Sequence, residues 1–327
     1  MDDGPPTIDD VVEAARRIRG HAVLTPLLRS DALDDVSGGR VLLKVEALQR
    51  TGTFKFRGAF NRICRLDKGE IARGVLAWSS GNHAQGVAAA AALVGAPATI
   101  VMPSDAPMPK IENTRALGAE IVFYDRYAES REAIGTAIAQ ERGATIVPPY
   151  DDPRIIAGQG TVGLEAAAQV AALGLIPDHA LSPCGGGGLI AGCALALASP
   201  FPGIEVHPVE PVGFDDTTRS LHAGERLSND PDARSVCDAL LAPEPGELTF
   251  ALNRRLLSDG VAVTDEDALG AVAWAYRNLR VVIELGGAVA LAAVLSGRFE
   301  CKDKTVLVIV SGGNIAPDMF IRALSDS

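Results

Sequence analysis

The sequence predicts an α/β protein of two lobes, with mostly parallel sheets covered by helices and a smaller lobe inserted into a larger one. Two observations predict this fold. Short apolar or β-branched runs recur along the chain, and an Ala-rich segment of helical character follows each of them. Strands that alternate with helices form βα units, which build parallel sheets with both faces covered. With 327 residues, of which 47% are hydrophobic, the chain also has enough apolar material for a large interior.

The expected strands are the β-branched or apolar runs themselves. They span residues 40–46, 74–80, 98–103, 119–125, 144–149, 179–184, 205–211 and 305–313. Residues 74–149 hold the most compact alternation of strand and helix, so we place a small domain at residues 67–150. The large domain then comprises residues 1–66 and 151–327.

The composition argues against several classes of protein. Lys and Arg total 30 against 41 Asp and Glu, and the resulting net charge of −11 argues against a nucleic-acid partner. The longest apolar stretch, residues 86–102, is broken by Gly95 and Pro97, so we expect helix, turn and strand and no membrane span. The first residues lack the pattern of a secretory signal, and the 5 cysteines form no CxxC pair. We therefore expect reduced thiols and a cytoplasmic location.

Three glycine-rich loops follow expected strands directly, at residues 79–86, 183–192 and 311–314. In sheets of this kind, ligands bind outside the carboxyl ends of the strands, so the three loops are expected to line one cleft. The second loop contains Gly185, Gly186, Gly187 and Gly188 and leads into an apolar helix. Glycines expose backbone N–H groups and the helix start adds positive potential, so a phosphate is the expected ligand.

The kind of phosphate is not settled by this loop alone. No Gly-Lys-Ser/Thr follows, so the P-loop pattern fails. Gly185 and Gly187 fit the dinucleotide fingerprint, but Ile190 stands where its third glycine belongs. Glu205 lies 20 residues beyond Gly185, where a ribose ligand would be expected. A nicotinamide-dependent dehydrogenase, or a nucleotide-binding sensor without catalysis, therefore stays open as an alternative.

Lys55 stands between two phenylalanines in the stretch TGTFKFRGA. Thr53 is a candidate helix N-cap, and an apolar stripe follows at Phe56, Ala59, Phe60 and Ile63. Lys55 then lies in the first helical turn, where apolar surroundings and the helix dipole depress the pKa of its amine, as a Schiff-base lysine requires. The alternative is a lysine whose stem covers Phe54 while its amine stays in water. A reactive amine and a phosphate cradle in one cleft together indicate pyridoxal 5'-phosphate.

Six motifs of the chain resemble, in order, those of threonine/serine dehydratases and serine racemase. They are KVEALQRTGTFKFRGAFN, SSGNHAQGVA, PYDDPRIIAGQGTVGLE, PCGGGGLIAG, VEPVGFDD and VLVIVSGGN. The resemblance covers about residues 10 to 320 and is more specific for the family than for the substrate. It implies the fold of the fold-type II (tryptophan-synthase β-like) pyridoxal phosphate enzymes, a small amino-acid substrate and a homodimer.

The resemblance also implies roles for the cofactor-binding residues. Lys55 would hold the cofactor covalently and later move the Cα proton, while Phe54 packs nearby. Asn82 would hydrogen-bond the phenolic oxygen, and Ser311 would meet the pyridine nitrogen. The amides of residues 185–188 would hold the phosphate. A neutral hydroxyl at Ser311 suits β-elimination, because the leaving hydroxide carries away the excess charge.

For the substrate, the resemblance implies a carboxylate-binding loop. Its members are Ser79, Ser80, Gly81, Asn82 and His83. Ser80 matches the serine that, in serine racemase, faces the lysine from the opposite side of the cofactor. Taken by itself, His83 is more often an ordinary loop histidine with satisfied hydrogen bonds than an acid or base. Arg131 matches a position that reaches a second carboxylate, with a solvated helix arginine as the alternative.

A candidate metal site follows the run at 205–211, where Glu210, Asp215 and Asp216 offer oxygen ligands suited to Mg²⁺, Mn²⁺ or Ca²⁺. By resemblance the ligands are Glu210, the carbonyl of Phe214 and Asp216. The alternative is that these acidic residues cap and stabilise the start of a helix and bind no metal.

We therefore expect a dehydratase (ammonia-lyase) that removes water from a small β-hydroxy-α-amino acid such as serine, threonine or 3-hydroxyaspartate, with serine racemase as the alternative. The chain departs from many relatives at residues 284–287, which read ELGG without a proline, and at Ala239, where a glycine is common. The methyl group of Ala239 is expected to narrow the substrate pocket. We expect no regulatory domain after the last motif and hence no isoleucine feedback.

Overall fold

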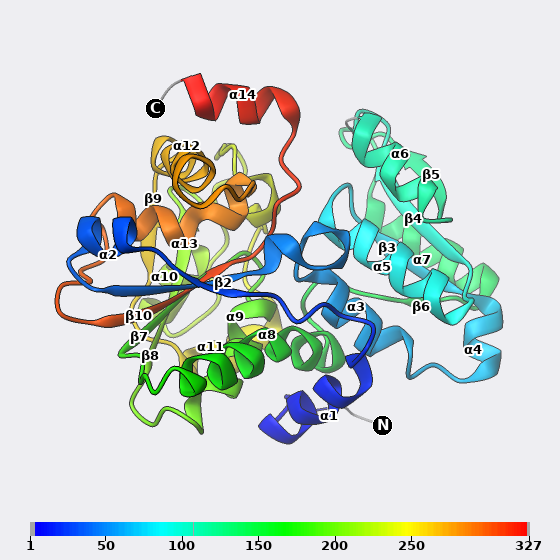
Figure 1. Cartoon of the computed structure of the whole chain (residues 1–327). Coiled ribbons are helices and arrows are strands. Elements are labelled where there is room, and N and C mark those ends of the chain that lie inside the picture. The colour runs from blue at the N-terminus through cyan, green and yellow to red at the C-terminus, as the bar shows by residue number, and fades with distance from the viewer. Residues whose placement is uncertain (1–3, 107, 326–327) are drawn as a thin grey trace.

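A computed structural model describes residues 4–106 and 108–325 and shows two lobes, each built around its own sheet (Figure 1). The larger sheet has the strand order β1-β2-β10-β7-β8-β9. Its strands are β1 (Leu27–Arg29), β2 (Arg40–Val45), β7 (His179–Pro183), β8 (Glu205–Pro211), β9 (Val261–Val263) and β10 (Thr305–Val310). β1 runs antiparallel to β2, and every other pairing in this sheet is parallel.

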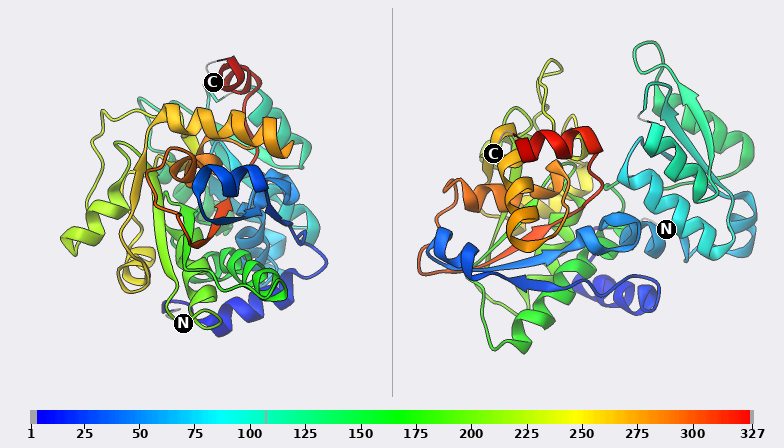
Figure 2. Two further views of the ribbon diagram at one scale, coloured as in Figure 1. Left: turned by 60° about the vertical axis from the view of Figure 1, so that its left-hand side comes forward. Right: turned by 45° about the horizontal axis from the view of Figure 1, so that its top comes forward.

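The smaller sheet has the order β5-β4-β3-β6 and is parallel throughout. Its strands are β3 (Val75–Trp78), β4 (Ala98–Pro103), β5 (Glu120–Tyr124) and β6 (Thr145–Ile146). All of them come from within residues 67–150. The exact domain limits stay a prediction. The lobe is set apart clearly in the right-hand view of Figure 2.

Helices cover both faces of each sheet. They are α1 (Ile8–Ile18), α2 (Asp31–Ser37), α3 (Lys55–Ile63), α4 (Lys68–Arg73), α5 (Asn82–Val94), α6 (Met108–Ala116), α7 (Arg131–Arg142), α8 (Pro153–Ala172), α9 (Gly188–Ala198), α10 (Asp216–Ala223), α11 (Glu247–Leu256), α12 (Asp265–Trp274), α13 (Leu285–Leu295) and α14 (Pro317–Ser325). Short turns are η1 (Glu46–Leu48), η2 (Arg50–Gly52), η3 (Asp238–Leu240) and the π-turn η4 (Ala275–Leu279).

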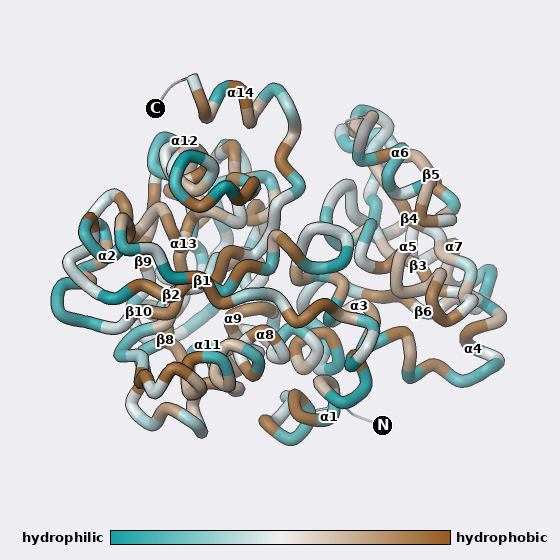
Figure 3. Tube along the Cα trace, in the orientation of Figure 1, coloured by the Kyte–Doolittle hydropathy of each residue, from teal (hydrophilic) through white to brown (hydrophobic). Residues whose placement is uncertain are grey.

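Because side chains alternate along each strand, the interior of each lobe is divided into separate hydrophobic cores on the two faces of its sheet. In the larger lobe, Leu181 packs in the core that includes α12 and α13, and its neighbour Ala180 packs in the core that includes α8 and α9. In the smaller lobe, Leu76 and Ala77 divide in the same way between two clusters. Figure 3 shows hydrophobic stretches along the strands and mostly hydrophilic colour on the outer loops.

Every run predicted as a strand contains one, whereas β1 and β9 were missed. Within the described residues, no helix combines the length and the apolar composition that crossing a membrane requires. The 5 cysteines are free thiols, and all but Cys64 are buried. α3 packs against α5 on one side and α8 on the other, so it joins the two lobes next to the site described below.

Candidate active site

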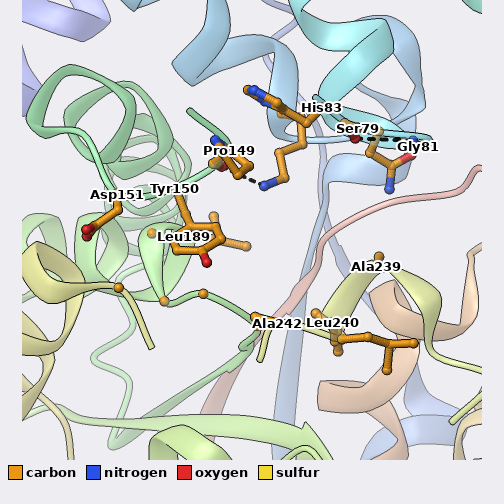
Figure 4. A pocket seen from close by; sticks show the side chains of 18 of the residues that line it. Ser79, Gly81, His83, Pro149, Tyr150, Asp151, Leu189, Ala239, Leu240 and Ala242 are labelled. Carbon is orange, nitrogen blue, oxygen red and sulfur yellow. Dashed lines mark hydrogen bonds between the residues drawn. The ribbon is translucent and has the colours of Figure 1, made fainter. Parts of the chain in front are cut away.

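The three glycine-rich loops meet at one cleft of about 630 Å³. They leave the carboxyl ends of β3, which belongs to the smaller sheet, and of β7 and β10, which both belong to the larger sheet. The cleft is therefore shared by both lobes. In Figure 4, Ser79, Gly81 and His83 lie along one edge, and Tyr150 and Leu189 lie across from Ala239 and Leu240.

The segment before Lys55 is fixed by the third loop. Thr53 pairs with Gly312 in a β-bridge, and the N–H of Phe54 donates to the carbonyl of Ser311 at 3.2 Å. Thr53 is consequently extended, with φ −155°, and the helix has Phe54 as its N-cap residue. The prediction of Thr53 as the N-cap is wrong by one residue, because its buried Oγ1 accepts no hydrogen bond from the start of the helix. The apolar stripe that follows is buried as predicted.

The amine of Lys55 points into the cleft and not into bulk water. Its Nζ donates to the carbonyl of Pro149 at 2.8 Å and lies 5.2 Å from the ring centroid of Phe54 (Figure 4 marks the first contact by a dashed line). Burial lowers its pKa to about 8, although the negative charge of Glu284 opposes this shift. The exposed, snorkelling alternative does not fit this position. A pKa near 8 gives the amine a much larger neutral, nucleophilic fraction near physiological pH than an ordinary lysine has.

The four-glycine loop leads into the start of α9. Gly187, the N-cap residue, has φ +89°, a left-handed conformation that favours glycine. A Cβ on Gly186 would come within 2.4 Å of the Tyr150 ring, so only glycine allows this approach. The first N–H groups of α9 have no acceptor within the helix and lie at its positive end. This arrangement suits an anion of the size of a phosphate.

Asn82 is held by partners that the sequence did not indicate. Its Nδ2 donates to Glu284 Oε1 at 2.7 Å, and its Oδ1 accepts from Nδ2 of Asn314 at 2.9 Å. These contacts fix the orientation of the amide and leave one N–H of Asn82 for a ligand. The sequence indicates no role for Glu284 at this site. The contact spans 202 residues, so no local pattern signals it. Burial raises the pKa of Glu284 to about 7.

The loop 79–83 lies at the cleft edge with His83 turned into the protein. Ser79 Oγ accepts from the N–H of Gly81 at 3.2 Å, and Ser80 lines the cleft. His83 Nε2 lies 2.8 Å from the carbonyl of Val147, which can only accept, so this nitrogen carries the proton. Burial, reinforced by Lys55, lowers the pKa of His83 to about 3. A neutral, anchored ring positions the loop and is no proton donor at neutral pH.

Two further side chains define the outer cleft. Arg131, the first residue of α7, lines it while donating from Nε to Glu132 Oε1 at 2.8 Å. Its side chain is 46% exposed, so it can turn toward a ligand. Ala239 also lines the cleft.

The comparisons with known proteins decide the family. A sequence profile described as "Pyridoxal-phosphate dependent enzyme" matches residues 18–312. The chain belongs to this family.

Its relatives within the pyridoxal-phosphate dependent enzymes differ in activity. L-threo-3-hydroxyaspartate ammonia-lyase of Pseudomonas sp is 40% identical over 96% of this chain and 97% of its own. The crystal structure of a threonine deaminase from T.th. matches with a TM-score of 0.89 and 42% identity, covering 95% of this chain and 99% of that one. Maize serine racemase matches with a TM-score of 0.91 and 37% identity, over 98% and 97%. The expected fold is confirmed.

The cleft fits the cofactor of this family. A phosphate suits the N–H groups at the start of α9, and the amine of Lys55 suits an aldehyde. Asn82 offers a free N–H, and Ser311, 5% exposed, lines the same cleft. Glu205 does not line it, because it is the first residue of β8 and lies at the end of the strand opposite the loops. The assignment of Glu205 as a ribose ligand is therefore wrong, which removes the main support for a nicotinamide enzyme.

The acidic residues expected to bind a metal lie at the carboxyl end of β8. Both oxygens of Glu210 accept hydrogen bonds from Thr217 and Thr218 at 2.7–2.9 Å. Burial, and then the charge of Asp216, raises the pKa of Glu210 to about 7, while burial raises that of Asp216 to about 6. Asp216 Oδ1 accepts from Asn229, but its buried Oδ2 has no partner. An unpartnered buried carboxylate oxygen fits a cation at this position.

Proposed function

We propose that this enzyme removes water from a small β-hydroxy-α-amino acid and releases a 2-oxo acid and ammonia. The observation that carries the proposal is the amine of Lys55, buried opposite a backbone anion site in one cleft. The names of the relatives support the reaction class, since they include both hydroxyaspartate and threonine ammonia-lyases. The substrates among which the enzyme chooses are serine, threonine and 3-hydroxyaspartate.

The residues of the site have different roles in this reaction. When bound, pyridoxal phosphate supplies an electron sink for the bond that breaks at Cα. Lys55 anchors the cofactor and then accepts the Cα proton as a base whose pKa lies near the working pH. The loop of residues 79–83 binds the substrate carboxylate. Loss of hydroxide from Cβ gives an enamine, which hydrolyses to the 2-oxo acid and ammonia after release.

A substrate panel tests this proposal. The cofactor-loaded enzyme is incubated with L-threo-3-hydroxyaspartate, L-threonine and L-serine, and 2-oxo acid, ammonia and D-serine are measured. We expect equal amounts of 2-oxo acid and ammonia from at least one substrate. Ser80 lines the cleft with Lys55, so racemisation of serine is the second candidate function. D-serine without any 2-oxo acid would replace the lyase proposal by a racemase, and neither product would overturn both.

Arg131 favours a substrate with a second carboxylate. We expect Arg131→Met to raise KM for 3-hydroxyaspartate about 10- to 100-fold, the value of a hydrogen bond to a charged group, and to leave threonine unaffected. Steady-state kinetics with both substrates check this. Arg126→Met is the matched control, because Arg126 is an exposed arginine of the same lobe that pairs with Asp105 and does not line the cleft. An equal effect on both substrates would contradict the assignment.

We also propose that Glu210, the carbonyl of Phe214 and Asp216 bind Mg²⁺, Mn²⁺ or Ca²⁺. After EDTA treatment, Mg²⁺ at 100 times its Kd is expected to raise the free energy of unfolding by about 2.7 kcal/mol. Asp216→Asn should abolish this gain, whereas Asp215→Asn should keep it, because Asp215 only accepts from Arg219. Denaturant unfolding with and without Mg²⁺ measures the difference. A full response in Asp216→Asn would exclude this site.

Assembly and location follow the family resemblance. We propose a homodimer, to be tested by light scattering of the loaded enzyme. The free thiols support a cytoplasmic location.

A further inference from the structure

A second set of metal-ligating side chains lies at the amino end of the larger sheet, away from the cleft. His179 is the first residue of β7, and Glu205 and His207 are the first and third residues of β8. His179 pairs directly with Glu205 across the two parallel strands. Glu205 and His207, two residues apart, point to the same face of the sheet. The three side chains therefore meet at one corner of the molecule.

The distances suit one metal ion. His179 Nδ1 lies 3.2 Å from His207 Nε2 and 3.1 Å from Glu205 Oε2, and the last two atoms are 3.8 Å apart. Zinc takes protein nitrogen and oxygen ligands at about 2.0–2.2 Å, so neighbouring ligands of a tetrahedral site are roughly 3.3–3.6 Å apart. Within the described chain, this is the one group of three His, Cys, Asp or Glu residues with such spacing.

The hydrogen bonds of His207 prepare it as a ligand. Its Nδ1 lies 2.8 Å from the carbonyl of Asp259, which can only accept, so Nδ1 carries the proton. With the proton on Nδ1, the neutral ring presents the lone pair of Nε2 toward His179 and Glu205. A backbone carbonyl that orients a histidine in this way is a usual partner of metal-binding histidines.

Without a metal, three electron-rich atoms compete for one proton. Nε2 of His207 and the carboxylate of Glu205 both accept, and only Nδ1 of His179 can donate between them. A cation at their centre would satisfy all three atoms together. The ring of Phe299 packs edge-on against both imidazoles, with centroids 5.2 and 4.9 Å away, and limits their rotation.

From this geometry we propose that His179, Glu205 and His207 form a second metal site, which binds Zn²⁺ or a similar transition-metal ion with water as the fourth ligand. Two imidazoles and one carboxylate favour such ions over Mg²⁺ or Ca²⁺, which prefer oxygen ligands. Glu205 is 56% exposed, so the ion can enter from solvent, while His207 is 9% exposed. A bound ion would tie β7 to β8 and, through Asp259, to the turn before β9.

The test uses the full-length, cofactor-loaded enzyme after EDTA treatment and dialysis, with excess MgCl₂ present to occupy the oxygen site. Zn²⁺ is titrated in competition with a chromogenic indicator, and Co²⁺ is added separately to report geometry by its visible spectrum. We expect one Zn²⁺ per chain and the intense bands of tetrahedral Co²⁺. His179→Ala and Glu205→Ala should each weaken Zn²⁺ binding by at least about tenfold. Zn²⁺ should raise the melting temperature of the wild type more than that of either of these two variants.

The exposed histidine His222 provides the matched control. It contacts the side chain of Asp259 and is not among the three ligands, so His222→Ala should bind Zn²⁺ as the wild type does. Lyase activity should be unchanged in all three variants, which shows that they are folded. Equal Zn²⁺ binding by His179→Ala and the wild type, as adventitious binding at a thiol would give, overturns the proposal. Failure of the wild type to bind Zn²⁺ also overturns it.

Discussion

Lys55→Ala is expected to abolish the production of 2-oxo acid, with a loss of at least about 10⁴-fold, the upper range for a group that transfers a proton. The variant loses both the anchor of the cofactor and the base. The visible absorption of the lysine-bound cofactor should disappear as well, and borohydride should no longer fix the cofactor to the chain. Activity assays and absorption spectra of the same preparation measure both effects.

A variant of another lysine in the cleft is the control that distinguishes the anchoring role of Lys55 from a general effect of removing a positive charge. Lys110 lines the cleft and forms an ion pair with Asp238 at 2.5 Å. Lys110→Ala should keep the visible absorption, because its amine is committed to a carboxylate on the opposite lobe. If Lys55→Ala retains the absorption band, or Lys110→Ala loses it, the anchoring lysine has been assigned wrongly.

The sheets were predictable where the strands are long and buried. Runs such as residues 98–103 and 305–310 are buried on both faces of a sheet and therefore read as continuous apolar sequence. β1 and β9 have only 3 residues each and lie at the edges of the larger sheet. A segment of three residues is too short to show the alternation of apolar and polar residues that marks a strand. It becomes a strand because β2 or β8 offers it hydrogen bonds.

The candidate site was predictable to the extent that topology determines it. Loops at the carboxyl ends of parallel strands converge, so the glycine-rich loops and Lys55 could be placed in one cleft. Side-chain contacts between distant segments could not be predicted. Asn82 and Glu284 become partners only because α5 and the start of α13 face each other in the folded chain.

The buried charges beneath the site were missed for a different reason. Lys44 lies inside the apolar run RVLLKV and Arg57 inside the buried stripe of α3, and both are fully buried. A charged residue within an apolar run is a sequence signal, because burial of an unpaired charge is too costly to be accidental. The carboxylates that pair with these two cations are Glu46 on η1 and Glu165 on α8, and only the structure identifies them.

The second large effect is expected at Arg57. Its guanidinium donates to both oxygens of Glu46 at 2.7 and 2.8 Å and to both oxygens of Glu165 at 2.8 Å. Lys44 Nζ adds a bond to Glu165 at 2.9 Å, so two cations balance two carboxylates. Arg57→Met leaves Glu46 fully buried and without its main counter-charge. We expect a loss of about 3–5 kcal/mol in the free energy of unfolding, measured by urea denaturation of the loaded enzyme.

Two comparisons show whether the loss comes from the buried charge. Arg142→Met removes an ion pair of half-exposed side chains with Glu120 and should cost less than about 1 kcal/mol. The double variant Arg57→Met/Glu46→Leu removes the charge that the single variant leaves unpaired, and it should recover part of the lost stability, since apolar pairs replace buried ion pairs at little cost. If the double variant is less stable than Arg57→Met, the cluster stabilises the protein through packing and geometry. The unpaired carboxylate would then not be the cause of the loss.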